Sequence, residues 1–400
     1  MVPAGTVAVI GAGIVGACIA HALSKRGASV TLIDREDPGH GCSFGNSGAI
    51  SPGSVVPLAM PGILATLPRM LRDPESPLYL PWGYLPRAAP WLVKFLASAR
   101  PDRVSAAAEQ LAALHADAVA SHQALVQELG VPELLLQRGH LHLYPDAEAI
   151  GKDAVAWTMR QRAGYVFEHL DRAGILALEP HIGPRYQAGL FLADHATIVN
   201  PLRYVQAIVR ACVDHGCKLR RAEVTALVPR ANCPWEVRDS AGTAQFDHVV
   251  VAAGAWSRAL LDPLGIRLAL ESQRGYHVQF TGASDTISRT VVLADRKVFL
   301  APMEGGLRVG GTVEIGGLQR PPDMRRAAML RRIACDTFAG LQGREASEWM
   351  GHRPCLPNSV PVIGPAAGQH GLWLAVGHGH LGLTDSVNTA RLLSNAMMGG

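Results

Sequence analysis

The stretch TVAVIGAGIVG, residues 6–16, decides the fold. The strand-like run Thr6–Ile10 leads directly into the turn Gly11-Ala12-Gly13-Ile14-Val15-Gly16, and the helix-like stretch Val15–Arg26 follows. A second strand-like run, Ser29–Ile33, ends in Asp34. Two strands joined by such a turn and helix, with an acidic residue about 20 positions further on, are typical of a βαβ unit that binds a dinucleotide. The sequence therefore predicts a site for NAD or FAD at its amino end.

Each residue type in this unit has a physical reason to be there. Gly11 permits the tight turn, Gly13 lets backbone N–H groups approach a pyrophosphate, and Gly16 lets the helix pack closely on the strand. The pyrophosphate would then lie at the positive end of the helix. Asp34 is placed to accept hydrogen bonds from a ribose diol, which disfavours a 2′-phosphate.

The composition is that of a globular protein with a large core. At 400 residues the chain is long enough for two domains, and 48% of its residues are hydrophobic. The net charge is only +4 and the basic residues are scattered, so no nucleic-acid partner is predicted. The seven cysteines include no C-x-x-C pair, which indicates neither a disulfide framework nor a metal site.

The cysteine usage fits a reducing, cytoplasmic setting, and hydropathy predicts no membrane span. The first apolar stretch holds the glycine turn rather than a signal-peptide core, and no run of about 18 uncharged apolar residues occurs. The stretch Leu80–Ala99 is rich in aromatic residues, prolines and basic residues. It could lie on a membrane surface, where a quinone would collect electrons, but packing within a second domain is the favoured interpretation.

The rest of the chain alternates between helical and strand-like patterns. The longest helical pattern, Ala106–Gly130, predicts one amphipathic helix. A helix is expected from Pro201 to about His215, and a last one at the carboxyl end. The predicted strands are Arg138–Tyr144, Leu219–Val228, Asp247–Ala252, Tyr276–Phe280, Lys297–Leu300, Leu307–Thr312 and Leu372–Val376.

Three glycine-rich turns, at Gly11, Gly254 and Gly377, follow strand-like runs far apart in the chain. In a doubly wound sheet such turns meet in the crevice beyond the carboxyl ends of the strands. A long cofactor contacted from several segments fits this convergence, so FAD is favoured over NAD. A colourless purified protein would favour the NAD alternative.

Seven segments, spread over nearly the whole chain, carry a family likeness. The chain resembles the FAD-dependent amine and D-amino-acid oxidoreductases, among them D-amino-acid oxidase, glycine oxidase and D-amino-acid dehydrogenase. It is most similar to the bacterial dehydrogenase branch, which includes D-hydroxyproline dehydrogenases. The matching segments are VIGAGIVG at the start, CSFGNSGAISP from residue 42, Leu178–Ile182, VVVAAGAWS from residue 249, Arg274–Val278, Gly351–Gly364 and Gly377–Thr384.

The likeness implies an α/β fold of two domains. A Rossmann-type FAD-binding domain would be assembled from residues 1–85, 186–262 and 349–400. A second, mostly antiparallel-sheet α+β domain for the substrate would come from residues 86–185 and 263–348. Non-covalent FAD is expected, although Cys355 lies near the position of the flavin-linked cysteine of some relatives.

The likeness also implies which residues contact FAD. Cys42 and Ser43 would approach the pyrophosphate and ribityl chain, and Asn46–Gly48 would lie near the isoalloxazine. The full expected set is Gly11, Gly13, Ile14, Val15, Gly16, Asp34, Arg35, Cys42, Ser43, Asn46, Ser47, Gly48, Ile50, Val224, Ala253, Gly254, Trp256, Gly379, His380, Leu381, Gly382, Leu383 and Thr384.

Arg353 is the expected anchor of the substrate. A guanidinium binds a carboxylate through two parallel hydrogen bonds, and Arg353-Pro354 matches the Arg-Pro pair that serves this purpose in the family. The alternative is a salt bridge between domains. Phe299 is expected in the substrate pocket, where glycine oxidase-like relatives carry a tyrosine, and His352 is a further candidate there.

Two histidines and a tyrosine are candidates for handling protons. His378 and His380 lie in the glycine-rich turn before the last helix, whose positive end could stabilise negative charge on reduced flavin. By the likeness, the backbone carbonyl at His380 would accept from the substrate amine. The histidines could instead be metal ligands or spacers, and Tyr276 could be either a pocket residue or a core aromatic with a satisfied hydroxyl.

The sequence therefore predicts a FAD-dependent dehydrogenase that removes a hydride from Cα of a small D-amino or cyclic imino acid. A quinone or an electron-transfer protein would accept the electrons. The expected location is the cytoplasm, with peripheral contact at the inner face of the membrane as the alternative. The alternatives are an oxidase that uses O2 and a flavin subunit of a larger amine dehydrogenase complex, which would need partner chains.

Overall fold

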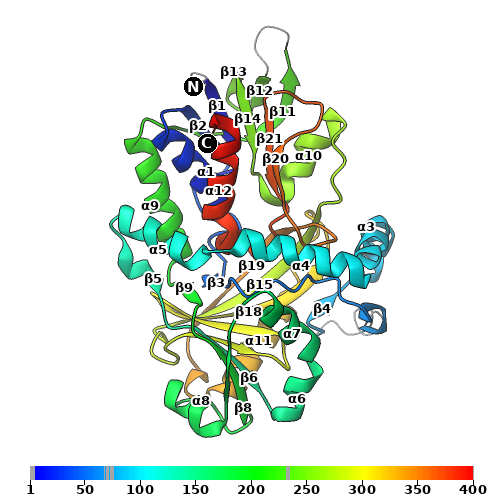
Figure 1. Cartoon of the computed structure of the whole chain (residues 1–400), viewed down its shortest axis with the longest axis vertical. Helices are drawn as coiled ribbons and strands as arrows, with labels where there is room; N and C mark the ends of the chain where they lie inside the picture. Colours follow the sequence, from blue (N-terminus) through cyan, green and yellow to red (C-terminus); the bar gives the residue numbers. More distant parts are fainter. Residues whose placement is uncertain (1–4, 67, 69–71, 73–75, 231–234, 400) are drawn as a thin grey trace.

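The computed structural model describes residues 5–66, 68, 72, 76–230 and 235–399. Two large sheets follow one another along the long axis of the molecule, and both chain ends lie beside the first sheet (Figure 1). Cys233 and parts of the segments that hold residues 1–85 and 186–262 lie outside the described residues.

The first sheet has six strands in the order β10-β2-β1-β14-β21-β20. All neighbours are parallel except β20, which runs antiparallel to β21. The predicted central strands are confirmed. The strands are β1 (Thr6–Ile10), β2 (Ser29–Asp34), β10 (Lys218–Arg221), β14 (His248–Val251), β20 (Val362–Pro365) and β21 (Leu372–Val376).

Both faces of this sheet are covered, as its continuous apolar strands require. On one face the helices α1 (Ile14–Lys25), α9 (Pro201–Asp214) and α12 (Gly382–Met398) pack on a core that includes Val7 and Val9. The other face, with Ala8 and Ile10, is covered by a small antiparallel sheet and a short helix. These elements are β11 (Val224–Pro229), β12 (Trp235–Asp239), β13 (Gly242–Phe246) and α10 (Ser257–Leu261).

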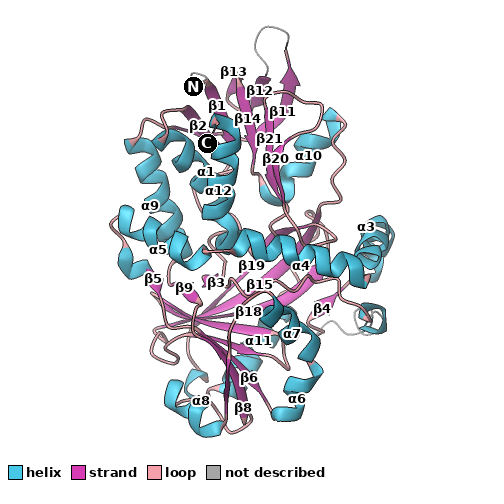
Figure 2. Cartoon of the chain, viewed as in Figure 1, coloured by secondary structure: helices cyan, strands magenta, loops and turns pink. Residues whose placement is uncertain are grey.

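The second sheet is mostly antiparallel and has nine strands. Its path is β19-β15-β18-β17-β16-β6-β8-β7, and β4 pairs with β18. Figure 2 shows this sheet below the six-stranded one. The strands are β4 (Leu78–Tyr79), β6 (His140–Tyr144), β7 (Glu168–Leu170), β8 (Ala188–Leu192), β15 (Glu271–Thr281), β16 (Thr290–Leu293), β17 (Val298–Met303), β18 (Gly306–Ile315) and β19 (Ala346–Cys355).

The second sheet has two chemically different faces. One face packs with α11 (Arg325–Thr337) on an apolar core that includes Tyr276, Val278 and Phe280. Side chains alternate between faces along a strand, so Gly275, His277 and Gln279 belong to the other face. His277 and Arg308 of that face contact the loop that follows β2, and thereby connect the two large sheets.

The remaining elements connect or cover the two sheets. A third small sheet is formed by β3 (Ala49–Ile50), β9 (Ala196–Ile198) and β5 (Leu135–Leu136). The remaining helices and 3-10 turns are α3 (Leu85–Ser98), α4 (Pro101–His115), α5 (Ala118–Glu128), α6 (Ala147–Lys152), α7 (Ala154–Arg162), α8 (Arg172–Leu178), η1 (Ile63–Thr66), η2 (Trp82–Tyr84), η3 (Pro132–Leu134), η4 (Gly254–Trp256), η5 (Asp262–Leu264) and η6 (Ala339–Leu341).

The prediction of one helix over Ala106–Gly130 was wrong, because the chain breaks between α4 and α5. Asp117 adopts a left-handed conformation with φ of 57°. The carbonyls of Leu114 and Ala116 accept hydrogen bonds from the Asn388 side chain of α12, at 2.8 and 2.7 Å. A tertiary contact therefore replaces the helical bonds that these carbonyls would otherwise accept.

The prediction of a single strand at Leu219–Val228 was also wrong. Residues 218–221 form β10 in the six-stranded sheet, whereas residues 224–229 form β11 in the small antiparallel sheet. The backbone N–H of Ala222 donates to the carbonyl of Asp34 at 2.8 Å, at the point where the chain leaves the first sheet.

The proposed segmentation into two domains stays a prediction. The first sheet draws its strands from residues 6–34, 218–251 and 362–376. Residues expected in the FAD-binding domain also supply strands of the nine-stranded sheet: β4, β8 and residues 349–355 of β19.

Buried neutral histidines predict that the fold loses stability in mild acid. Burial lowers the pKa of both His122 and His140 to about 4, and each donates or accepts two hydrogen bonds in the interior. The unfolded chain takes up protons below pH 6.5 that the folded chain does not, so stability falls as the pH drops from about 6.5 towards 4. Each histidine should lower the free energy of unfolding by about 2 kcal/mol when the pH drops from 7 to 5.

Chemical denaturation of the holoenzyme at pH 7 and at pH 5 measures this loss of stability. A His40→Ala variant, which changes an exposed histidine, should show the same loss as the wild type. Equal stability of the wild type at pH 7 and pH 5 would contradict the prediction.

Candidate active site

A cavity lies at the carboxyl ends of the parallel strands, beside the turn after β1. It contains about 1400 Å³ free of protein atoms, part of it open to solvent. Most residues expected to contact a dinucleotide line it. They are Gly11, Gly13, Ile14, Val15, Asp34, Arg35, Cys42, Ser43, Asn46, Val224, Ala253, Gly254, Trp256, Gly379, Gly382 and Leu383.

Glycine is required at two positions of the first turn. Gly11 has φ of 107°, and a Cβ there would lie 2.4 Å from the carbonyl oxygen of Ala252. A Cβ on Gly16 would lie 1.8 Å from the carbonyl oxygen of Gly11. Both clashes involve backbone atoms, so a side chain could enter only if β1, α1 and β14 moved apart.

The start of α1 presents backbone donors to the cavity. Gly13 caps the helix without a side chain, and Ser43 Oγ accepts from the N–H of Ile14 at 2.9 Å. Asp34 Oδ2 accepts from the N–H of Ala12 at 2.6 Å, which fixes the carboxylate at the end of β2. An anion is favoured at this helix end and a diol beside the carboxylate.

The second sheet closes one side of the cavity through β19. His352 lines the cavity and stacks edge-on against Trp256, with ring centroids 5.4 Å apart. The Arg35 guanidinium also lies over the Trp256 ring, 4.1 Å from its centroid. Cys42 Sγ accepts from the N–H of His352 at 3.1 Å, and burial raises the pKa of this thiol to about 11.

Known proteins match this chain over almost its full length. The family model for FAD dependent oxidoreductases (DAO) matches residues 6–396. The chain belongs to this family. It is 37% identical over 400 residues to a D-amino-acid oxidase of Bradyrhizobium diazoefficiens, which covers 98% of this chain and 95% of that protein. It is 32% identical to D-amino acid dehydrogenase 2 of Ralstonia nicotianae, over 97% of this chain and 95% of that protein.

Solved structures share the fold of this FAD-dependent oxidoreductase. Glycine oxidase from Geobacillus kaustophilus aligns with a TM-score of 0.77 at 19% identity, over 98% of this chain and 94% of that one. L-proline dehydrogenase from P. horikoshii aligns with a TM-score of 0.75 at 18% identity, over 100% of this chain and 94% of that one.

The residues of the cavity fit FAD. The glycines leave room for a pyrophosphate against the end of α1, Asp34 can accept from a ribose, and the cavity continues past Ala253 to the turn at Gly377–Gly379. FAD supplies two-electron oxidation when it is bound. Several predicted contacts do not line the cavity in this structure. They are Gly16, Ser47, Gly48, Ile50, His380, Leu381 and Thr384.

Three of these residues pack or form hydrogen bonds elsewhere in the fold. A Cβ on Gly48 would lie 2.1 Å from the carbonyl of Ile198, and Ile50 is fully buried. Thr384 Oγ1 accepts from the N–H of Ser51 at 3.1 Å, which ties β3 to the start of α12. Cavity residues that sequence reasoning missed include Ile10, Ile33 and Ala252, whose positions at strand ends were the available signal.

Arg353 lies on the face of the second sheet that is directed toward the cofactor loop. Its Nη1 donates to the carbonyl of Thr312 at 3.1 Å, and among the described residues no acidic group forms an ion pair with it. Among the described residues, Arg353 therefore forms no salt bridge between the domains, which was the alternative to a role in substrate binding. Burial lowers the pKa of Arg353, but an arginine remains charged at neutral pH.

Gly275 makes room for this guanidinium. A Cβ on Gly275 would lie 2.3 Å from Cζ of Arg353 and 2.4 Å from its Nη2. We therefore expect Gly275→Ala to displace the Arg353 side chain and to raise KM for a carboxylate substrate by at least about tenfold, a loss of about 1.4 kcal/mol of binding.

Steady-state kinetics and the flavin content of Gly275→Ala measure this effect. Gly305→Ala is the matched control, because its Cβ would meet only Gln279 Nε2 at an ordinary 3.7 Å. An unchanged KM in Gly275→Ala would show that the position of the guanidinium does not matter for binding.

The two histidines of the last turn occupy different environments. His378 is buried, and its Nε2 lies 3.0 Å from Thr389 Oγ1 of α12, which agrees with a role in holding the turn. His380 is exposed in this structure. Nearby protein and the charge of Arg353 lower the pKa of its imidazole to about 4, so the ring is neutral at neutral pH.

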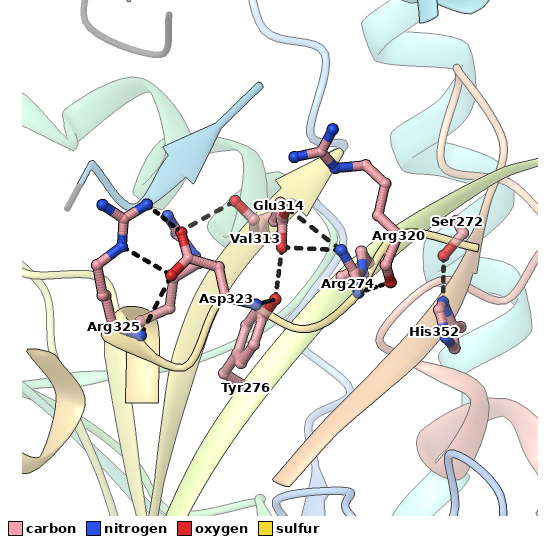
Figure 3. Close-up of polar contacts among 10 residues, drawn as sticks. Ser272, Arg274, Tyr276, Val313, Glu314, Arg320, Asp323, Arg325 and His352 are labelled. Atoms are coloured by element: carbon pink, nitrogen blue, oxygen red, sulfur yellow. Dashed lines mark hydrogen bonds and ion pairs between the residues drawn. The ribbon is translucent and has the colours of Figure 1, made fainter. Parts of the chain in front are cut away.

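Tyr276 lies on the opposite face of the sheet from Arg353. It is buried in the apolar core, its hydroxyl donates to Glu314 Oε2, and it accepts from the N–H of Asp323 at 2.9 Å (Figure 3). The expectation that this hydroxyl enters the substrate pocket is therefore corrected: Tyr276 is the core aromatic with a satisfied hydroxyl. The register decides this, because Gly275 and Tyr276 are adjacent and must face opposite ways.

The two residues expected in the substrate pocket are also placed. Phe299 is half-buried and pairs with Gly310, which puts it on the same sheet face as Arg308. His352 lines the cofactor cavity, and its Nδ1 lies 2.8 Å from Ser272 Oγ (Figure 3). Burial and the charge of Arg274 lower the pKa of His352 to about 4.

Proposed function

We propose that this FAD-dependent oxidoreductase dehydrogenates a small D-amino acid or cyclic imino acid. The observation that carries the proposal is the Arg353 guanidinium, which has no ion-pair partner among the described residues and lies over Gly275 on the sheet face that meets the cofactor loop. The names of the curated relatives support the choice of a D-amino acid.

Arg353 would hold the substrate by its carboxylate. The guanidinium already has one N–H on the Thr312 carbonyl, which orients its plane. Its remaining N–H groups can donate to the two carboxylate oxygens. Phe299 would give the neighbouring wall an apolar surface for a side chain or ring.

The amine must lose a proton before Cα gives up a hydride. With a pKa of about 4, the His380 imidazole is a weak base for an ammonium group. We propose instead that the backbone carbonyl of His380 accepts a hydrogen bond from the neutral amine. Loss of the hydride and an amine proton gives an imine, which hydrolyses to a 2-oxo acid and ammonia or, if cyclic, remains as a ring imine.

The electron acceptor is proposed to be a quinone or an electron-transfer protein. Trp82 is 60% exposed and Val93 is 66% exposed, and α3 carries the basic residues Arg87 and Lys94, whereas Trp91 and Phe95 of the same stretch are buried. Such a surface favours peripheral contact with an anionic membrane on the cytoplasmic side. Among the described residues, no helix is long and apolar enough to cross a bilayer.

The alternative electron acceptor is O2. It is favoured by the name of the 37% identical relative, a D-amino-acid oxidase.

Anaerobic mixing of the purified holoenzyme with single D- and L-amino acids tests the proposal. The visible flavin absorbance should bleach with a D-amino acid, D-proline or a hydroxyproline isomer, and the corresponding L-amino acid serves as the control. Turnover with an artificial dye but without oxygen uptake would support a dehydrogenase rather than an oxidase. Absence of bleaching by every amino and imino acid would overturn the proposal.

A further inference from the structure

Three consecutive backbone carbonyls of the cofactor loop are bound by two side chains of the second sheet. Arg308 Nη1 donates to the carbonyl of Phe44 at 2.9 Å and also to that of Asn46. His277 Nδ1 lies 3.1 Å from the carbonyl of Gly45, and because a carbonyl only accepts, this nitrogen carries the proton. We call residues 44–46, held in this way, the carbonyl clamp.

The clamp belongs to a segment that forms the cofactor cavity. Cys42, Ser43 and Asn46 all line the cavity, and Asn46 Oδ1 accepts from the N–H of Gly48 at 2.8 Å. Trp349 packs beneath the clamp, since a Cβ on Gly45 would lie 2.1 Å from its ring. Because side chains of the second sheet bind these three carbonyls, the loop backbone at this edge of the cavity is held in one conformation.

The guanidinium of Arg308 is buried, and its hydrogen-bond partners in the described part of the chain are neutral. Only 5% of the residue is exposed, and its Nε and Nη2 both donate to the neutral Gln279 Oε1, at 2.9 and 2.7 Å. Among the described residues no carboxylate forms an ion pair with it. Burial lowers the pKa of Arg308 to about 10, so the group is charged at neutral pH.

Arg274 of the same sheet shows the contrast. It is also fully buried, but it faces the opposite side and lies 3.3 Å from Glu314 Oε1 (Figure 3). A buried guanidinium beside a carboxylate produces little net field at a distance, whereas a lone one raises the local electrostatic potential. A fixed positive potential favours a bound group that gains negative charge, as FAD does on reduction.

We propose that Arg308 is a positioning residue that holds the carbonyl clamp, and that its uncompensated charge raises the reduction potential of the bound FAD. The proposal rests on the FAD site alone and does not depend on which amine is oxidised. Arg308 was missed by sequence reasoning, although a charged residue within the apolar strand Leu307–Thr312 was a signal.

Three variants separate the charge from the hydrogen bonds. Gln279→Glu keeps an oxygen acceptor for Nε and Nη2 and adds the missing negative charge. Arg308→Lys keeps the charge but loses the fork of donors, and Arg308→Gln loses both. Gln342→Glu, at an exposed position, is the control for the same change in net charge.

The measurements are the reduction potential, by dye-coupled titration without any amine substrate, and the dissociation constant of oxidised FAD. In Gln279→Glu, reduced FAD should bind about tenfold more weakly relative to oxidised FAD, a potential about 30 mV lower. Its affinity for oxidised FAD should stay within about twofold of the wild type, because the clamp is intact. In Arg308→Lys, affinity for oxidised FAD should fall at least about tenfold while the potential changes less.

Each half of the proposal can fail separately. A potential in Gln279→Glu equal to that of Gln342→Glu overturns the role of the charge. Wild-type affinity for oxidised FAD in Arg308→Lys and Arg308→Gln overturns the positioning role. If Arg308→Gln does not fold, Gln279→Glu still tests the effect of the charge, and Arg308→Lys still tests the effect of the hydrogen bonds. Because no amine is used, these results are independent of the substrate screen.

Discussion

Arg353→Ala is expected to lower kcat/KM by roughly a thousandfold. Two charge-assisted hydrogen bonds to a substrate carboxylate are worth about 4 kcal/mol, and each 1.4 kcal/mol is a factor of ten. Most of the loss should appear in KM. The turnover number should also fall, because a carboxylate that is held loosely no longer directs Cα to one position.

The bound FAD should be unaffected in this variant, since Arg353 does not line the cofactor cavity. Flavin content and steady-state kinetics are therefore measured together. Arg185→Ala is the matched control: it removes an arginine that pairs with Asp295 on the surface and should leave kcat/KM unchanged. Wild-type turnover in Arg353→Ala would remove this residue from the site.

Gly11→Ala is expected to abolish stable FAD binding. The new methyl group would lie 2.4 Å from the Ala252 carbonyl, and the residue would keep a φ that side chains rarely adopt. Strain of this kind costs about 1–3 kcal/mol, and relief requires β1 and β14 to separate where the pyrophosphate binds. The protein should purify without flavin absorbance, or lose its flavin on gel filtration.

The control for this variant is Gly151→Ala. Gly151 lies in α6, and a Cβ there meets nothing within 4 Å. Circular dichroism shows whether Gly11→Ala still folds. A folded Gly11→Ala protein that retains stoichiometric FAD would contradict the interpretation of the first turn.

The first sheet and the cofactor cavity could be predicted from the sequence because their signals are local. A glycine that must adopt a positive φ, a helix that begins beside it and an acid at the next strand end all lie within residues 6–34. Continuous apolar strands such as His248–Val251 are typical of a sheet covered on both faces. These features depend on neighbouring residues and hence appear in the sequence itself.

The features that could not be predicted depend on distant contacts. The break between α4 and α5 is stabilised by Asn388, more than 270 residues away. The direction of Tyr276 depends on which face of β15 packs against α11, and alternation alone does not say which. The pairing of Arg308 with the loop at 44–46 joins two segments with no common pattern.

The position of a bound carboxylate tests the central claim most directly. A crystal structure of the FAD-bound enzyme with a substrate-like carboxylate should place both carboxylate oxygens 2.7–3.2 Å from Arg353 nitrogens, the range of ordinary hydrogen bonds. The amino group of the same ligand should lie near the His380 carbonyl. A carboxylate bound elsewhere, with Arg353 contacting only the Thr312 carbonyl, would contradict the proposed site.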